Sequence, residues 1–360
     1  MRKTLAAPLA AVSLCTFAAG AQAQSSVTIY GIVDSGISYV SNSGGHSAWI
    51  FDTGVPQGNR LGFTGTEDLG GGMKALFRLE NGFNLNDGSM GQGGLMFGRQ
   101  AYVGLANQIG TLTLGHQYDF MGDIIGNYSI AYVAGVYAFH PGDYDRVSGD
   151  RLDNTVKFVS NNFGGFTAGA MYGFGNTAGN FHQNSSMSFG LTYDHGPLSL
   201  GAAYTDINNF SINPTNDLGV STLFGQPLTG SPIVADSMKT WGLGGSYSIG
   251  KVGIMANYTG TRISYMGNSA TLSTLEGSLL YHFTPALVAG AGYTYSKLES
   301  SHWGQTSVGI DYFLSKRTDL YAQVNYQLAS GDGTHAVILT LPTSSTNKQV
   351  VAGIGIRHKF

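Results

Sequence analysis

Charged residues are scarce in this chain, and their scarcity restricts the class of protein that it can form. Asp, Glu, Lys and Arg make up 11% of the 360 residues, whereas they account for about a quarter of a typical soluble domain. Proline occurs only 9 times and cysteine once, as Cys15, so no intrachain disulfide can form. A soluble domain with so few charges would have a surface prone to aggregation. The composition therefore favours a protein embedded in lipid.

Long hydrophobic runs are confined to the N-terminus. Arg2 and Lys3 precede an apolar run that ends at Ala19, and Ala21-Gln22-Ala23 has the small residues of a cleavage site. This pattern predicts a signal peptide, residues 1–23, and a mature chain, residues 24–360. Loss of the two positive charges of Arg2 and Lys3 changes the net charge from -3 to -5, which argues against nucleic acid as a partner. No later run is long enough for a membrane-spanning helix.

Alternation of apolar and polar residues is the main pattern in the mature chain. In the last eleven residues, Val350, Ala352, Ile354 and Ile356 lie on one face and Arg357 on the other. Such a period of two predicts a strand with one apolar and one wet face. A long apolar strand at the end of the chain would leave an unpaired edge in an open sheet, so we expect it to pair with the first strand in a closed barrel.

Sixteen alternating segments can be counted, and the connections between them are alternately short and long. The fold predicted is all-β: a 16-stranded antiparallel transmembrane β-barrel with short periplasmic turns and long extracellular loops. Sixteen strands enclose a water-filled channel, whereas eight would not. We expect the long loops at residues 40–59, 81–98, 116–153, 175–185, 206–239, 260–270, 296–302 and 328–348.

Several segments resemble the general diffusion porins of β-proteobacteria, of the Neisseria, Bordetella and Burkholderia type. They are residues 26–34 (SVTIYGIVD), 59–75 (NRLGFTGTEDLGGGMKA), 99–105 (RQAYVGL), 153–158 (DNTVKF) and 355–360 (GIRHKF). The resemblance implies a homotrimer in the outer membrane of a Gram-negative bacterium, with a water-filled pore and the third long loop folded inward. It also implies contacts with outer-membrane lipid and lipopolysaccharide, and recognition of the C-terminal strand, ending at Phe360, by the assembly machinery.

The 116–153 connection is the candidate constriction loop. Its middle is too apolar for an exposed loop, so we expect it to pack against the inner wall of the barrel. Alternation places the basic side chains Arg60, Lys74, Arg78 and Lys157 in the lumen, with Arg151 nearby, because a charge facing lipid would cost roughly 2–4 kcal/mol. The same alternation gives Arg99 an outward direction. The acidic side chains expected on the loop side of the opening are Asp119, Asp123, Asp143 and Asp145.

The function predicted is passive diffusion of ions and small hydrophilic solutes with weak charge selectivity. We expect no enzymatic activity, no cofactor and no metal, because the 9 histidines are scattered without the spacing of a catalytic or metal site. Two alternatives remain. One is a substrate-specific outer-membrane channel with a binding track along its lumen, and the other is a structural or adhesive barrel closed by its own loop.

Overall fold

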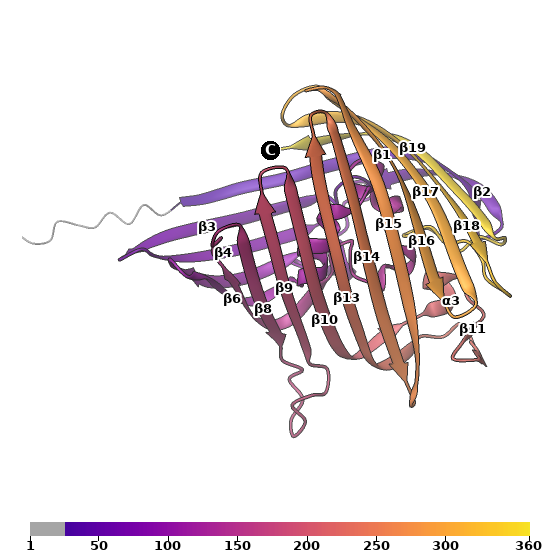
Figure 1. The fold of residues 1–360 in the computed structure, drawn as a ribbon, viewed down its shortest axis with the longest axis horizontal. Helices are drawn as coiled ribbons and strands as arrows, with labels where there is room; N and C mark the ends of the chain where they lie inside the picture. Colours follow the sequence, from indigo (N-terminus) through magenta and orange to yellow (C-terminus); the bar gives the residue numbers. More distant parts are fainter. Residues whose placement is uncertain (1–25) are drawn as a thin grey trace, which may run out of the picture.

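The computed structural model describes residues 26–360, and seventeen of its strands form one antiparallel sheet that closes into a barrel (Figure 1). These strands are β1 (Ser26–Ser43), β2 (His46–Thr53), β3 (Arg60–Gly70), β4 (Met73–Gly82), β5 (Gln100–Ala106), β6 (Gly110–Tyr118), β7 (Arg151–Ser160), β8 (Phe166–Gly173), β9 (Ser186–His195), β10 (Leu198–Ile212), β13 (Ile233–Ile249), β14 (Val252–Tyr265), β15 (Asn268–Thr284), β16 (Leu287–Leu298), β17 (Ser301–Phe313), β18 (Thr318–Ser330) and β19 (Lys348–Lys359). The signal peptide expected at residues 1–23 lies outside the described residues.

The first and last strands close the barrel. Along one edge of β1, Ile32 lies opposite Lys359 and Val40 opposite Val351, so the C-terminal strand has no free edge. Along its other edge, β1 pairs first with β3 and then with β2. Because β2 and β3 share one edge, the seventeen strands occupy sixteen positions, and the predicted closed 16-stranded barrel is confirmed.

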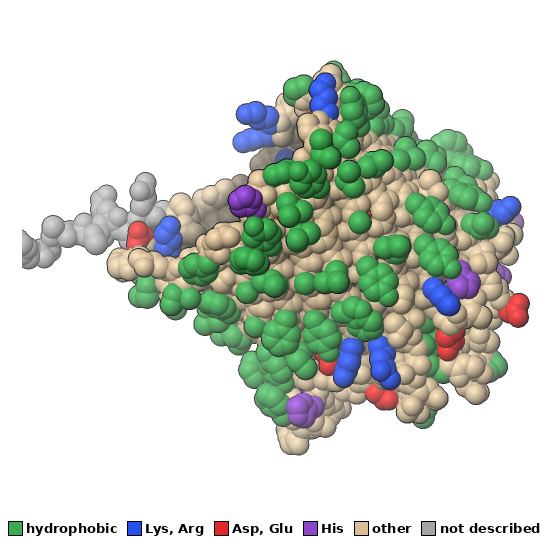
Figure 2. Space-filling model, in the orientation of Figure 1, with side chains coloured by type: hydrophobic (Ala, Val, Ile, Leu, Met, Phe, Trp, Pro, Cys, Tyr) green, Lys and Arg blue, Asp and Glu red, His purple; other side chains and the backbone are tan. Residues whose placement is uncertain are grey.

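Apolar side chains point outward along the strands, as the alternation predicts. Val27, Ile29 and Ile37 on β1 are exposed on the outer wall, whereas Asp34 and Ser38 on the opposite face of the strand are fully buried inside. The same alternation continues around the barrel and gives the band of hydrophobic side chains over the middle of the strands in Figure 2. The outer wall is therefore fitted to the hydrocarbon interior of a membrane.

Three of the expected long loops are mostly strand in the structure, and a fourth, 206–239, is shortened to the residues between β10 and β13. Residues 40–59 contain the end of β1, a turn at Gly44-Gly45 with positive φ at both glycines, and β2. Residues 260–270 and 296–302 are mostly strand, interrupted only by tight turns at Met266-Gly267 and Glu299-Ser300. Beyond the apolar band the two faces exchange character: Ile263, Ala270 and Leu298 are buried inside, whereas Arg262 and Lys297 are exposed. The pattern of a lipid-facing strand therefore ends there, while the backbone pairing continues.

Three of the remaining long connections carry short helices, and one of these also holds a small hairpin. The 3₁₀ turn η1 (Gln92–Gly94) lies before β5, and α3 (Pro214–Leu218), β11 (Thr222–Leu223) and β12 (Gln226–Pro227) lie between β10 and β13. The connection between β6 and β7 holds α1 (Phe120–Ile124), η2 (Ile125–Tyr128), α2 (Ala131–Ala134), η3 (Val136–Ala138) and η4 (Pro141–Asp143). No helix between residues 26 and 360 has the length and apolar character needed to cross a membrane.

Candidate functional site

The connection between β6 and β7, which we call the inward loop (residues 119–150), lies inside the barrel. Its helix α1 contacts β10, which lies three positions from β7 in the sheet, and its helix α2 contacts β17, far from β6 and β7 around the barrel. Ile124, Ile125 and Tyr128 are buried in one cluster with Ala203 and Ile207 of β10, and Ile130 and Val133 are buried in a second. The apolar middle of the loop thus packs on the inner wall, as its composition predicted.

Glycines on the inner wall make room for this loop. A Cβ atom at Gly244 of β13 would come closer than 3.0 Å to the ring of Tyr128, and one at Gly292 of β16 would meet Ile130 in the same way. At Gly309 of β17 the obstacle is the backbone of Val133, which cannot rotate away. Part of the high glycine content therefore serves the fit between wall and loop rather than turns.

A buried charged cluster, formed by His140, Asp145 and Glu276, fixes the loop to the wall. Nδ1 of His140 lies 2.5 Å from Asp145, and Nε2 lies 2.9 Å from Glu276 on β15. The other carboxylate oxygen of Glu276 accepts a hydrogen bond of 2.5 Å from the amide of Ile130. Burial alone would lower the pKa of His140, but the two carboxylates outweigh it and raise this pKa to about 10. The imidazole is therefore charged at neutral pH and donates from both nitrogens.

The beginning and end of the loop are joined by a second buried ion pair. Asp119 caps α1 by accepting a hydrogen bond from the amide of Gly122 at 3.2 Å, and it pairs with Arg146. Asp119 and Arg146 are both almost fully buried, and Arg146 also reaches Asp150 at 3.2 Å. Because both ends are held together, the inward loop forms a compact unit.

Opposite the loop, basic side chains gather around Tyr118 and Glu80. Arg99 donates from Nη2 to the hydroxyl of Tyr118 at 2.6 Å and from Nε to Glu80 at 2.8 Å. Arg151 also donates to Tyr118, and its guanidinium lies 4.3 Å from the centre of that ring. Arg60 is 4.0 Å from Glu80. A single carboxylate and one phenol therefore hold three guanidinium groups in place.

Two cavities lie between the loop and this basic wall. One, of about 500 Å³, has Arg60, Arg99, Arg151, Asp123 and Asp150 among its lining residues. The other, of about 510 Å³, is lined in part by Arg78, Glu80 and Lys157, and it shares Arg60, Tyr118 and Asp123 with the first. Together the cavities carry five basic side chains and three carboxylates, which leaves an excess of positive charge. We call this space the opening.

The structure brings five of the predicted residues to the opening: Arg60, Arg78, Arg151, Lys157 and Asp123. Asp123 forms an ion pair with Lys157 at 2.5 Å across it. Lys74 instead lies opposite Asp68 at the turn end of β4, exposed and outside both cavities. Phe360 lies at the junction where β1 pairs with β19, which we call the seam. Its amide donates to the carbonyl of Gly31 at 3.1 Å.

Three of the four carboxylates predicted at the opening are located elsewhere. Asp119 and Asp145 are buried, because each neutralises a buried cation of the loop, Arg146 and His140 respectively. Asp143 lines a separate cavity of about 270 Å³ and accepts hydrogen bonds from Ser148. The sequence alone could not show which of these carboxylates face the opening and which are buried. The loop has no regular alternation of polar and apolar residues from which the direction of each side chain could be predicted.

Arg99 is the residue for which the sequence-based direction was wrong. It precedes β5, so the alternation of that strand does not extend to it, and its side chain turns inward to Glu80 and Tyr118. The cost of a charge facing lipid, which we used to place Arg60 and Lys157 in the lumen, also applies to Arg99 and favours an inward direction for it. The charged cluster of His140, Asp145 and Glu276 carried no sequence signal, because Glu276 and His140 are 136 positions apart.

Comparison with known proteins gives consistent results. The family model described as Gram-negative porin matches residues 10–332. An outer membrane porin protein of Bordetella pertussis is 29% identical over 416 aligned residues, covering 100% of both chains. Outer membrane porin protein 32 of Delftia acidovorans is also 29% identical, over 98% of this chain and 99% of its own. Among solved structures, the anion-selective porin from Comamonas acidovorans superposes with a TM-score of 0.77 at 24% identity, covering 94% of this chain and 100% of that chain.

Proposed function

This chain belongs to the Gram-negative porin family and forms a passive diffusion channel in the outer membrane, and we propose that the basic side chains at its opening give it a modest preference for anions. The observation that carries the proposal is the excess of five basic side chains over three carboxylates in the two adjoining cavities. A ring of one sign of charge at close quarters selects ions of the opposite sign.

The arrangement of the charges supports a modest rather than a strong preference. Asp123 and Lys157 neutralise each other, and Glu80 is shared between Arg60 and Arg99. The net field is therefore smaller than five cations alone would give. The anion selectivity named for the porin from Comamonas acidovorans is in the same direction.

The test is the reversal potential of purified protein in a planar bilayer under a KCl gradient. Arg60→Glu reverses a charge at the opening, so it should shift the reversal potential toward cations. Lys74→Glu makes the same change of charge at the turn end of β4 and serves as the matched control, with a much smaller expected shift. A wild-type potential that favours K⁺, or equal shifts in the two variants, would contradict the proposal.

A substrate-specific channel is the alternative that these recordings can also detect. A lumen with a binding track gives conductance that saturates, or that one solute blocks. A conductance that stays linear in salt concentration supports general diffusion. Membership of a channel family supports the expectation that the chain is not an enzyme.

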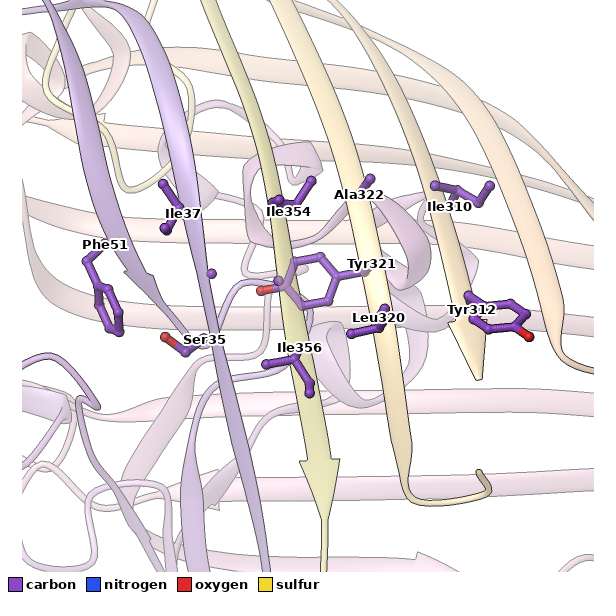
Figure 3. A pocket seen from close by; sticks show the side chains of 12 residues that line it. Ser35, Ile37, Phe51, Ile310, Tyr312, Leu320, Tyr321, Ala322, Ile354 and Ile356 are labelled. Carbon is purple, nitrogen blue, oxygen red and sulfur yellow. The ribbon is translucent and has the colours of Figure 1, made fainter. Parts of the chain in front are cut away.

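We propose further that the wall around the seam joins three copies of the chain. A shallow apolar groove of about 690 Å³ crosses this wall, and its lining includes Ile37, Phe51, Ile354 and Ile356 (Figure 3). Gly36 and Gly355 lie opposite each other across the seam and line this groove. Because they have no side chains, the wall is hollowed there. Conductance steps in groups of three support a homotrimer, and single steps contradict it.

The remaining assignments concern maturation and the membrane environment. We propose that residues 1–23 are removed as a signal peptide and that residues 24–360 form the porin domain, with 116–153 as its constriction loop. The strand that ends at Phe360 is proposed to be recognised by the outer-membrane assembly machinery. Outer-membrane lipid and lipopolysaccharide are proposed to surround the apolar band.

A further inference from the structure

The stretch between β2 and β3, residues 54–59, leaves the barrel wall and enters the lumen. Along β1, Ser35 lies opposite Thr53 and Ile32 lies opposite Arg60. From Ser35 to Ile32 β1 covers three positions, whereas its partner covers seven, so four residues of the partner have no place in the sheet. Unpaired backbone cannot face lipid, and these residues therefore turn inward. We call residues 54–59 the inner bulge.

The sequence of the inner bulge explains why the strand breaks here. Pro56 has no amide hydrogen to donate to a neighbouring strand. Gly54 has a φ of 76°, and a Cβ atom there would come within 2.8 Å of the Cα atom of Gly58. The inner bulge thus closes tightly on itself. Its residues 54–58 all line the cavity of about 500 Å³ at the opening.

Direct main-chain contact joins the inner bulge to the inward loop. The amide of Val136 donates to the carbonyl of Val55 at 2.7 Å. The side chain of Val55 is buried in one cluster with Tyr137. A Cβ atom at Gly135 would come within 2.7 Å of Val55, so the two segments touch without a gap. The opening is therefore bounded by the inner bulge as well as by the inward loop and the basic wall.

Asp34 on β1 holds the inner bulge at three points. Its carbonyl accepts the amide of Gly54 at 2.8 Å, and its own amide donates to Oδ1 of Asn59 at 2.5 Å. Its carboxylate accepts the amide of Gln57 at 2.9 Å and, on the other oxygen, the hydroxyl of Tyr321 at 2.8 Å. Asp34 is fully buried, so it does not meet solutes and acts through the position of the inner bulge.

Gln57 is the polar side chain that the inner bulge contributes to the opening. It lines the same cavity as Arg60, Arg99 and Arg151. Asp34 engages its main-chain amide, whereas its Oε1 has no hydrogen-bond partner within residues 26–360. A carboxamide oxygen accepts hydrogen bonds, so this group is free to interact with water and solutes in the opening.

We propose that the inner bulge is a second constriction element of the channel, and that Asp34 is the residue that positions it. The inference rests on the proposed function for the path that solutes take through the opening. The inner bulge contains no charged residue, whereas the basic wall carries the charge of the opening. The basic wall therefore sets the sign of ion selectivity and the inner bulge limits the size of the solute.

A variant that lacks residues 55–58 provides the main test. The deletion should bring Gly54 opposite Asp34 and Asn59 opposite Val33, so that β2 and β3 become one continuous strand in the present register. Because an even number of residues is removed, the alternation of inward and outward side chains is also kept. The barrel can therefore close as before, without the inner bulge.

The readouts are single-channel conductance in planar bilayers and the swelling of liposomes in sugar solutions. Conductance should rise in the deletion variant, and a trisaccharide should enter faster relative to a monosaccharide than it does through the wild type. The control lacks residues 177–180, in the connection between β8 and β9 and outside both cavities, and should match the wild type. Folded deletion variant with unchanged or lower conductance and an unchanged ratio of the two sugars would overturn the proposal.

A single thiol at position 57 tests the inner bulge without a deletion, and decides the question if the deletion variant does not fold. Gln57→Cys has no other cysteine after the predicted signal peptide, which contains Cys15. A negatively charged methanethiosulfonate reagent should attach to this thiol and reduce the current through the open channel. Gln108→Cys, at the short turn between β5 and β6, is the control and should lose no current. An undiminished current in modified Gln57→Cys would overturn the proposal.

The positioning role of Asp34 is tested in the Gln57→Cys background. Asp34→Asn leaves one carbonyl oxygen for the two donors that the carboxylate now holds, so the inner bulge should shift and the reagent should remove less current. Asp311→Asn neutralises another buried carboxylate, on β17, whose partner is Arg357, and should leave the loss of current unchanged. Equal losses in the two double variants would refute the role of Asp34.

The reversal potential under a KCl gradient keeps this result separate from the proposed anion preference. Removal of uncharged residues should leave its sign as in the wild type. A wild type that prefers K⁺ would contradict the anion preference and leave the second constriction standing. A deletion variant with wild-type conductance and sugar permeation would contradict the second constriction and leave the anion preference standing.

Discussion

The carboxylate of Glu276 on β15 lies 2.9 Å from Nε2 of His140, which joins the barrel wall to the inward loop across 136 positions of sequence. The same carboxylate accepts the amide of Ile130 at 2.5 Å, so one wall residue holds the loop at two points. Both partners are almost completely buried. The position of the loop therefore depends on a few atoms of Glu276. Breaking their contacts would leave buried charges without partners, which costs free energy.

Replacement of Glu276 by glutamine should destabilise the folded barrel. The charge of His140 would lose one of its two buried partners, and removal of one member of such a pair costs about 3–5 kcal/mol. The measurement is the temperature at which the band of folded protein disappears in electrophoresis of samples heated stepwise. The noise of the single-channel current is a second readout. Glu67→Gln, on an exposed position of β3, is the matched control and should behave as the wild type does.

Alkaline pH should loosen the loop through His140. Its pKa is raised from 6.5 to about 10 in the folded protein, so its contribution to stability is complete below about pH 6.5 and is lost as the pH rises through 10. The unfolding temperature of the wild type should fall across this range. In His140→Gln this part of the pH dependence should be absent, and an identical slope in both proteins would refute the assignment.

A methyl group at Gly309 should displace the inward loop. The Cβ atom of Gly309→Ala would overlap the backbone of Val133, and overpacking of this kind costs about 1–3 kcal/mol. We expect a lower unfolding temperature and a changed single-channel conductance. In Gly277→Ala, on β15, the added methyl group meets no atom within 4 Å, so both quantities should stay at their wild-type values.

Loss of the charge at Arg99 should weaken the anion preference. In Arg99→Gln, Glu80 would keep Arg60 and Tyr30 as neighbours but lose its closest cation at 2.8 Å. The reversal potential under a KCl gradient should move toward cations. Arg317→Gln removes a charge at a short turn and should leave it unchanged. A null result for Arg99→Gln would mean that this guanidinium only positions Glu80 and Tyr118.

Deletion of Phe360 should lower the amount of folded protein in the outer membrane. Its main chain forms two hydrogen bonds with Gly31, and its ring packs on the same glycine at the seam. The amount of heat-modifiable protein in membrane fractions is the measurement, with His358→Ala as a control that keeps the terminal aromatic residue. A normal level in the deletion variant would show that assembly does not depend on Phe360.

The sequence determined the barrel because a strand between lipid and water must alternate. Val27, Ile29 and Ile37 face lipid and Asp34 faces inward for that reason alone, and the same pattern at Ile354 and Ile356 predicted the pairing of the ends. The apolar middle of the loop at residues 124–139 also predicted its inward position. In each case the side chain has only one environment that its polarity permits.

Tertiary structure decided what no local pattern encodes. Beyond the apolar band, beside the turns at Met266-Gly267 and Glu299-Ser300, apolar side chains such as Ile263 and Leu298 are buried inside, so these strand ends lack the lipid-facing pattern that marks a strand in the sequence. Within the inward loop, Asp123 reaches the opening, whereas Asp119 and Asp145 are buried. Asp119 pairs with Arg146 and Asp145 with His140, and folding brings these partners together. The charge at the opening thus depends on which carboxylates find a buried partner, and long-range contacts such as that between His140 and Glu276 decide it.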